Sequence, residues 1–409
     1  MQQGELIPGL FRSEFSKICA VLTRYMGVEH IHAAEDIASE VFIAALESWS
    51  YKGIPANPVA WLYTVAKNKA RNYLHRNKLF SEKIIEELHQ TESISEEPDI
   101  DWSEKNISDS QLQMLFAICH PSIPVEAQVG LSLRILCGFG IDEIANAFLT
   151  NKETINKRLF RAREKLREEK VNLTLPPEAE IQSRLETVLT TLYLLFNEGY
   201  YSESQENVLR QELCLEAMRL TYMLIENENT NTPSVNALFA LMCFHSSRFP
   251  ARKSGDEQFV LYGDQDETLW NKELIARGAY HLHQASVGKT LSKYHLEASI
   301  AYWHTIKEDT KEKWESILQL YNQLLQIAYS PIAALNRTYA LSKANGHEEA
   351  IREAEKLQLN DNQYYFTLLG VLYKVVDPKK AISKFEKALS LARTQADKKA
   401  IELHLNKLR

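Results

Sequence analysis

Basic residues gather on one predicted helix, over residues 152–167, in a chain whose formal net charge is −7. Residues 151–170 contain eight Lys or Arg and only four Glu. Apolar residues recur there at helical spacing, so one face can pack while the other carries charge. Such a face can read base edges with its N-terminal half and hold phosphates with its cations. The candidate DNA contacts are Lys152, Asn156, Lys157, Arg158 and Arg161.

The preceding segment completes a helix-turn-helix pattern. A short helix carrying Ile141, Ile144, Ala145 and Phe148 leads to a turn predicted at 149–151. Thr150 and Glu153 have the spacing of a capping box, which predicts that the second helix starts there. The alternative is a solvated amphipathic helix, since such helices are common.

A second basic helix is predicted over residues 55–78, with Pro58 where a helix can begin. Short polar side chains recur every four residues on one face and are flanked by Lys and Arg, an arrangement that can read bases while holding the backbone. Trp61 and Tyr63 can stack on an unpaired base, worth ~1–3 kcal/mol per base. Trp61 is equally compatible with a core position. The candidate contacts are Trp61, Thr64, Lys67, Asn68, Arg71, Asn72 and Arg76.

The helix predicted upstream, AAEDIASEVFIAALESW, carries acidic residues in its first turns. Glu35, Asp36 and Glu40 are expected to be exposed there. Acidic side chains make a poor nucleic-acid surface, because they repel phosphate. We therefore expect this helix to dock on another protein.

Helical spacing dominates the sequence, and alternating strand-like stretches are nearly absent, so the predicted fold class is all-α. The chain has 409 residues, a natural size for several domains. An acidic stretch with too little apolar surface to fold alone separates two compact blocks, and Pro176 and Pro177 precede a long third block. The expected domains are 8–80, a linker over 81–109, 110–170 and 181–409.

Several protein classes are disfavoured by the sequence. The five cysteines are scattered, odd in number and without CxxC spacing, which indicates reduced and mostly buried thiols in a cytoplasmic protein. No signal peptide and no apolar run of membrane-spanning length are recognised, so we expect no membrane association. His281 and His283 fall on different helix faces and make a poor metal pair. We expect no cofactor, no metal site and no enzymatic activity, since Gly-rich phosphate loops and nucleophile elbows are absent.

Three blocks in this order resemble a known family. AEDIASEVFIAALESW followed by NPVAWLYTVAKNKARNYLHR resembles sigma-70 region 2 in its extracytoplasmic-function form, and residues 110–167 resemble region 4. The third block, with RLETVLTTLYLLFNEGYYSE and YSPIAALNRTYAL, resembles the tetratricopeptide-like extension of one subgroup of these sigma factors. Ser39 and Asn72 depart from the family pattern, where Gln and often Asp stand.

The resemblance implies a promoter-specific transcription initiation factor. Region 2 would dock on core RNA polymerase and open the −10 element of promoter DNA, and region 4 would bind the −35 element as duplex. The alternative is a helix-turn-helix regulator or adaptor whose repeat domain binds a protein or peptide. The basic helix at 55–78 beside an acidic docking helix favours the sigma factor.

The third block carries polar residues in apolar surroundings. Asn197, Glu198, Gly199 and Tyr200 are expected to interrupt a very apolar helix and to form a polar network, and Arg252 is a candidate partner of Asp264 or Asp266. Residues 364–376 and the segment with Ala381, Phe385 and Ala388 have the spacing of one tetratricopeptide hairpin. We expect 181–409 to regulate or assist the sigma regions through intramolecular contact.

Overall fold

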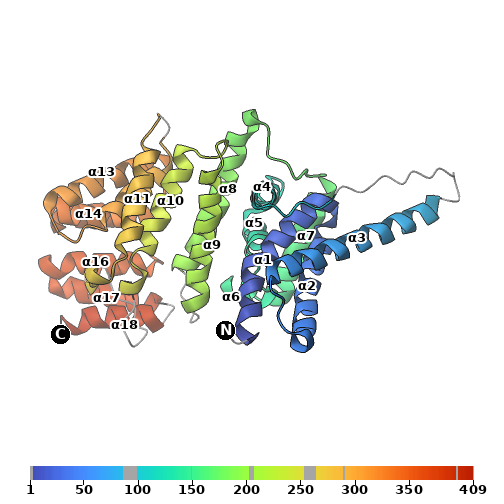
Figure 1. Ribbon diagram of the computed structural model, residues 1–409. Coiled ribbons are helices and arrows are strands. Elements are labelled where there is room, and N and C mark those ends of the chain that lie inside the picture. Colours follow the sequence, from blue (N-terminus) through green and yellow to red (C-terminus); the bar gives the residue numbers. More distant parts are fainter. Residues whose placement is uncertain are drawn as a thin grey trace. The chain divides into compact units, whose positions relative to one another are not determined.

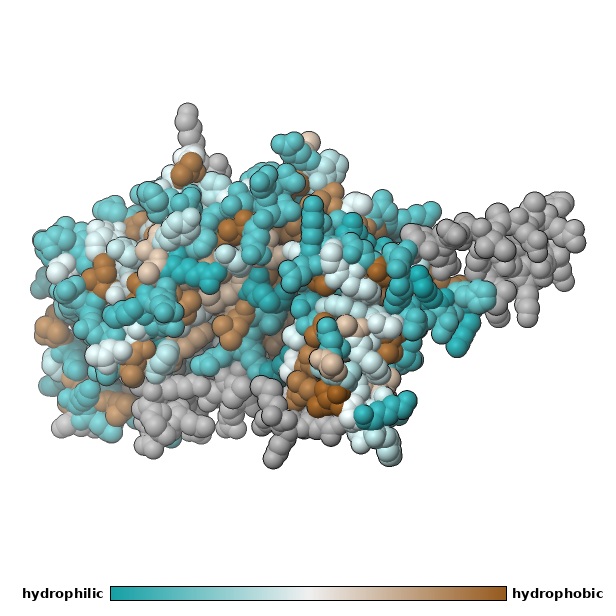
Figure 2. Space-filling model, in the orientation of Figure 1, coloured by the Kyte–Doolittle hydropathy of each residue, from teal (hydrophilic) through white to brown (hydrophobic). Residues whose placement is uncertain are grey.

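The computed structural model describes residues 3–85, 99–148, 150–201, 207–252, 264–288, 291–392 and 395–408. Helices are the regular elements throughout this part of the chain, and no strand occurs in it, which confirms the all-α prediction (Figure 1). The chain divides into two compact units, Met1–Thr230 and Asn231–Arg409. None of the described helices is both long and apolar enough to cross a membrane. The face seen in Figure 2 is mainly hydrophilic, with small separate hydrophobic patches.

The first unit begins with three packed helices, α1 (Gln3–Met26), α2 (Ile31–Lys52) and α3 (Pro58–Ile85), with the short η1 (Val28–His30) between α1 and α2. Phe15, Trp49 and Leu62 are among the fully buried side chains that join them. Helix α3 begins at Pro58, as predicted, and the Asn57 side chain accepts the Ala60 N–H at 3.0 Å. This cap sets the start of the helix on which the first set of candidate contacts lies.

A second group of helices in the same unit contains the helix-turn-helix. It comprises α4 (Glu104–Ile118), α5 (Val125–Leu131), the π-helical turn η2 (Ser132–Leu136), α6 (Ile141–Ala147) and α7 (Lys152–Glu168). The linker expected over 81–109 is shorter in the structure, because α3 extends to Ile85 and α4 starts at Glu104. Ile100 is buried, so the end of this stretch packs instead of remaining free.

Two further helices, α8 (Glu178–Tyr201) and α9 (Asn207–Glu226), belong to the first unit. Arg184 on α8 donates to the Phe116 carbonyl at 2.7 Å, and Arg219 on α9 donates to the Leu136 carbonyl at 2.7 Å. The buried Thr191 hydroxyl donates to Gln128 Oε1, also at 2.7 Å. The start of the C-terminal extension is therefore packed on the helix-turn-helix part.

The segment 197–200 does not interrupt α8, contrary to the expectation from sequence. Helix α8 is continuous through Tyr201, and Gly199 and Tyr200 are buried within it. A single glycine costs a helix only ~1 kcal/mol relative to Ala, which the packing of the surrounding apolar residues offsets.

The second unit is a series of helices in which consecutive members mostly pack on one another (Figure 1). The helices in chain order are α10 (Pro233–Ser246), η3 (Phe249–Arg252), η5 (Glu267–Leu269), α11 (Lys272–Ala285), α12 (Lys293–Trp303), α13 (Lys311–Ile327), α14 (Pro331–Asn345), α15 (His347–Lys356), α16 (Gln363–Val376), α17 (Pro378–Leu391) and α18 (Gln395–Asn406). Helices α16 and α17 form the hairpin that the sequence placed at residues 364–376 and beyond. Its residues Ala381, Phe385 and Ala388 are fully buried.

Polar residues of the second unit have structural roles. Asp266 caps η5 by accepting the Thr268 N–H at 2.9 Å. His281 Nδ1 lies 2.8 Å from Asn236 Oδ1, and burial lowers the pKa of His281 to about 4. No group of three or more His, Cys, Asp or Glu side chains that could hold a metal ion occurs among the described residues. All five cysteines are buried free thiols, as expected.

The α16–α17 hairpin depends on close approach of a helix backbone to an aromatic ring. A Cβ atom added at Gly370 would lie 2.7 Å from two ring atoms of the fully buried Phe385. We expect Gly370→Ala to lower the free energy of unfolding by about 1–3 kcal/mol through overpacking, measured by urea denaturation. The matched control is Gly9→Ala on α1, where nothing lies within 4 Å and about 0.5–1 kcal/mol of stabilisation is expected. Equal effects of the two substitutions would contradict this packing.

Candidate nucleic-acid interface

Helix α3 presents the predicted polar face to solvent. Thr64, Asn68 and Asn72 are exposed at four-residue spacing, while Leu62, Ala66 and Ala70 on the opposite face are fully buried. Arg76 is also exposed, and Lys67 and Arg71 are partly exposed. The structure therefore brings these candidates together on one accessible surface.

The two aromatic side chains at the start of α3 differ in availability. Trp61 is partly exposed, and its ring packs edge-on against the buried Trp49 with centroids 5.3 Å apart. Tyr63 is stacked on Trp102 at 4.4 Å and donates its hydroxyl to Glu14 at 2.5 Å. Tyr63 therefore already has an internal stacking partner, and the expectation that it stacks on an unpaired base fails in this conformation. Trp61 remains the aromatic candidate.

Three basic side chains of α3 are paired with acids of this same chain. Lys67 Nζ lies 2.5 Å from Asp99 Oδ1, and Arg71 donates to the same oxygen at 3.0 Å. Lys69 pairs with Glu40 on α2 at 2.6 Å. The hydrogen bond from Lys67 holds the pKa of the Asp99 carboxyl below its usual value. One Asp99 carboxylate oxygen therefore contacts both Lys67 and Arg71.

The acidic helix α2 has a different accessible surface from the one predicted. Asp36 and Glu40 are exposed, as expected. Glu35 is not, since its side chain is only 5% exposed. It accepts hydrogen bonds from Arg163 Nε at 2.8 Å and from Arg134 Nε at 3.1 Å. The prediction for Glu35 was wrong because helical spacing cannot show that a later segment covers this part of the helix.

Exposed apolar residues on α2 were missed from the sequence. Ile43 is 54% exposed and Leu46 is 51% exposed, one to two turns after Glu40. Tyr51 and Ile54 follow at the end of the helix and in the next loop, also exposed. The exposed side of α2 therefore combines carboxylates with apolar side chains, a composition that suits a protein partner better than a phosphate backbone.

Helix α7 exposes most of the candidates in the helix-turn-helix. Lys152, Asn156, Lys157 and Arg161 are exposed, while Ile155, Leu159, Ala162 and Leu166 are buried against the rest of the unit. Lys152 pairs with Asp142 on α6 at 2.6 Å. The guanidinium of Arg158 lies 5.7 Å from the centre of the Phe148 ring, so it packs on the preceding helix.

One residue of this face was missed. Phe160 is 57% exposed in the middle of the charged side of α7, one turn after Asn156. The sequence could have predicted this exposure, because Phe160 lies four residues after Asn156 and outside the buried apolar stripe of the helix.

The start of α7 differs from the predicted capping box. Asn151 is the N-cap, and its side chain accepts the Thr154 N–H at 2.8 Å. The predicted cap, Thr150, lies one residue earlier, and its N–H donates to the Ala145 carbonyl at 2.9 Å. Of the predicted turn, Leu149 lies outside the described residues. On α6, Glu143 accepts the Gly140 N–H at 2.6 Å.

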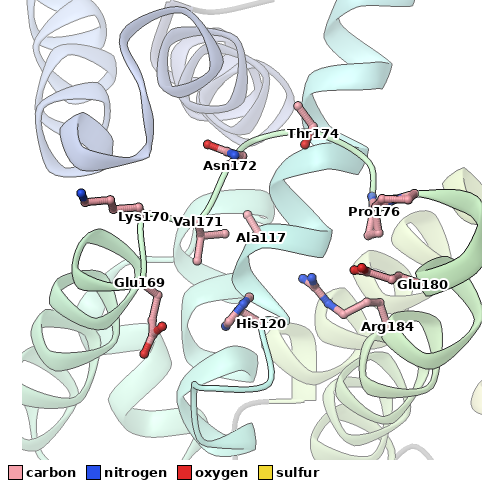
Figure 3. A pocket seen from close by; sticks show the side chains of 11 residues that line it. Ala117, His120, Glu169, Lys170, Val171, Asn172, Thr174, Pro176, Glu180 and Arg184 are labelled. Carbon is pink, nitrogen blue, oxygen red and sulfur yellow. The ribbon is translucent and has the colours of Figure 1, made fainter.

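A small cavity of about 250 Å³ lies where α4, the end of α7 and the start of α8 meet. Figure 3 shows His120 and Arg184 facing this space together with Glu180. His120 Nδ1 lies 2.7 Å from Ser122 Oγ, and burial raises the pKa of the neighbouring Cys119 thiol to about 12. Cys119 is buried and His120 is paired with the Ser122 hydroxyl, so the two residues form part of a packed turn.

The capping difference can be tested directly. Asn151→Ala should lower the free energy of unfolding by about 1 kcal/mol, because the Thr154 N–H in the first turn of α7 loses its acceptor. Thr150→Ala should have little effect, since its side chain does not cap the helix. Urea denaturation of both variants measures these changes. A larger decrease in the free energy of unfolding for Thr150→Ala than for Asn151→Ala would support the capping box predicted from sequence.

The comparisons with known proteins agree with this geometry. Residues 10–80 match the family described as sigma-70 region 2, and residues 184–286 match a family of unknown function, DUF6596. An uncharacterised protein of Rhizobium meliloti is 31% identical over 395 residues, covering 95% of this chain and 92% of its own length. No solved structure gives a significant match.

Sigma factors are among the relatives. The extracytoplasmic-function (ECF) RNA polymerase sigma-E factors of Haemophilus influenzae and Escherichia coli K12 are each 29% identical over 153 and 152 residues. These matches cover 36% of this chain and 79% and 78% of the two relatives. The region 2 match over residues 10–80 contains most of the basic helix α3. The chain therefore belongs to the sigma-70 family, as an ECF-type sigma factor that carries a C-terminal DUF6596 extension.

Proposed function

We propose that this chain directs promoter-specific initiation by binding core RNA polymerase through α2, the −10 element through α3 and the −35 element through α7. The single observation that carries the proposal is the separation of surfaces in the first unit. Two exposed basic helix faces lie on α3 and α7, whereas α2 exposes acids and apolar residues. One partner of each chemistry, nucleic acid and protein, fits this arrangement.

The −10 surface consists of the exposed Thr64, Asn68 and Asn72 with Lys67 and Arg71 beside them. Opening a promoter extrudes bases at a cost of a few kcal/mol each, which stacking and hydrogen bonds must offset. Trp61 is partly exposed at the start of α3 and can supply one stacking face. On binding DNA, Lys67 and Arg71 would exchange the Asp99 carboxylate for a phosphate. The ion pairs with Asp99 support this proposal, because they place both cations around a single oxygen atom.

The −35 surface consists of the first three turns of α7. Asn156 lies beside Phe160, which can contact the methyl group of thymine, and Asn can bond to adenine. Lys157 and Arg161 extend from the same exposed side and suit phosphates on either edge of the groove. Lys152 would first leave Asp142, an exposed pair that is weak in water.

The extension is proposed to regulate or assist the sigma regions. Its first two helices are attached to α4, α5 and η2 by hydrogen bonds with buried partners, so they are part of the fold of the first unit. A truncation near residue 175 would remove the buried Leu185, Val188 and Leu192 and would expose the surface of the first unit that α8 covers. The informative truncation is therefore after Thr230, where the first compact unit ends. Higher promoter output from the shorter chain means inhibition by the second unit, and lower output means a positive role.

Polymerase binding is tested on α2. Ile43→Asp should weaken the affinity for core polymerase at least about tenfold, because an apolar contact is replaced by a buried charge. Asp36→Arg should have a smaller, salt-dependent effect. Glu402→Arg on α18 is the matched exposed control and should bind normally. The measurement is co-elution and fluorescence titration, and failure of the wild-type chain to bind core polymerase at any salt concentration would reject the proposal.

DNA binding is tested on α7. Each phosphate contact that is lost should reduce the log–log salt slope of binding to a −35 duplex by about 0.9. We expect this decrease for Lys157→Ala and Arg161→Ala but not for Lys379→Ala, an exposed lysine of the second unit. Asn156→Ala should instead reduce discrimination between promoter sequences at a nearly constant slope. Unchanged slopes in both α7 variants would exclude this face as the phosphate contact.

A further inference from the structure

A small cavity in the first unit is lined by residues from three separate elements. Its volume is about 250 Å³. His120 follows the end of α4, Val171 follows α7 and Arg184 lies on α8 (Figure 3). Pro176 and Pro177, in the connection between α7 and α8, also line it. The cavity therefore lies where the helix-turn-helix part meets the first helix of the extension.

The wall beside α7 is fixed by the way in which this helix ends. Lys170 has a φ of 49°, a left-handed conformation that is unfavourable for residues other than glycine. Its N–H donates to the Arg167 carbonyl at 3.1 Å. The Val171 N–H donates to the Leu166 carbonyl, also at 3.1 Å. These are the two hydrogen bonds of a Schellman motif, so this wall is preformed, as in most ligand sites.

Arg184 supplies the cavity with a cation that has donors to spare. Its Nη2 donates to the Phe116 carbonyl at 2.7 Å, which holds the guanidinium at the end of α4, facing the cavity (Figure 3). Its buried Nε has no hydrogen-bond partner among the described residues. An Arg side chain carries five N–H donors and stays charged, so it retains donors for a ligand carboxylate. Burial lowers the pKa of Arg184, and a carboxylate bound beside it would counter that shift.

His120 supplies a second, neutral donor. Its Nδ1 accepts the Ser122 N–H at 3.3 Å. Burial and the nearby Arg184 lower the pKa of His120, so its ring is neutral near pH 7. A neutral imidazole whose Nδ1 accepts a hydrogen bond carries its proton on Nε2. That N–H is the donor that the ring can offer to a ligand oxygen.

The carboxylates around the cavity make a simple anion a poor ligand. Glu180 lies one turn before Arg184 on α8, is exposed and faces the same space (Figure 3). Glu169 also lines the cavity, but it is paired with Lys165 at 2.9 Å. The Lys170 ammonium group points away from the cavity in Figure 3. The site therefore presents one positive and one negative side chain as neighbours on a helix, with Cβ atoms about 5–6 Å apart.

We propose that this cavity binds a free α-amino acid, with its carboxylate on Arg184 and His120 and its ammonium group on Glu180. A zwitterion of this kind matches the two neighbouring charges of opposite sign. The volume of about 250 Å³ lies below that of sites for drug-sized ligands and suits a molecule of this size.

The ligand would touch the helix-turn-helix part and α8 together, so its binding would strengthen the attachment of the extension. Binding is a property of the free chain, and only an effect of the amino acid on initiation would rest on the proposed function.

The test is isothermal titration calorimetry of the full-length chain with pools of the standard amino acids, followed by each member of an active pool. We expect at least one amino acid to bind at one site per chain. Acetate has no ammonium group and should bind at least about tenfold more weakly, and phosphate should be repelled by Glu180. The proposal is rejected if no amino acid binds at about 10 mM. It is also rejected if acetate or phosphate binds equally well, because the site would then be a non-specific anion site.

Variants locate the binding site. Glu180→Gln removes a charge at an exposed position, so it should fold normally, lose at least about tenfold in amino-acid affinity and keep its affinity for acetate. Glu178→Gln is the matched control, exposed in the same first turn of α8 and outside the cavity, and should bind as the wild type does.

Arg184→Lys should weaken the binding of the amino acid and of acetate alike, because the planar donor geometry is lost. Wild-type affinity for the amino acid in Glu180→Gln, or in Arg184→Lys that is folded by circular dichroism, would overturn the proposal. Failure of the chain to bind polymerase would reject the proposed function and would leave these titrations unaffected.

Discussion

The arrangement of the first unit depends on how one buried carboxylate is shared between two guanidinium groups. Glu35 cannot be solvated at 5% exposure, so the fold must supply it with cations, and it does so from η2 and α7. Because Arg163 serves this purpose, it is withdrawn from the basic face of α7. Lys152, Lys157 and Arg161 on the same helix keep their exposure.

Acidic residues form ion pairs with the basic side chains of α3 and α7. Asp99 neutralises Lys67 and Arg71, Glu40 neutralises Lys69, and Asp142 neutralises Lys152. These pairs are at least partly exposed, so each is weak and exchangeable in water. The contacts of Glu35 are different, because its side chain is buried. Exposure therefore separates the weak surface pairs from the buried ion cluster around Glu35.

The C-terminal extension begins as a structural part of the first unit. Arg184 and Arg219 each donate to a carbonyl at or near a helix end, Phe116 in α4 and Leu136 in η2, where the helix dipole favours a cation. Buried Thr191 and Gln128 add a third contact between α8 and α5. The match to DUF6596 over residues 184–286 includes most of α8, all of α9 and the first helices of the second unit. The first helices of the extension therefore share the core of the first unit.

The sequence by itself determined the helical fold class, the two basic faces and the buried stripes of α3 and α7, because these follow from spacing along a single helix. It also located the α16–α17 hairpin through Ala381, Phe385 and Ala388, whose spacing reflects packing between neighbouring helices. Only the tertiary structure decided that Glu35 is buried, that Tyr63 is stacked on Trp102 and that α8 runs unbroken through Gly199. Each of these outcomes depends on residues 39 to 128 positions away, or on packing that offsets a local helix penalty. The spacing of residues along one helix does not show which distant segment packs on that helix. Whether a charged side chain is buried depends on that packing.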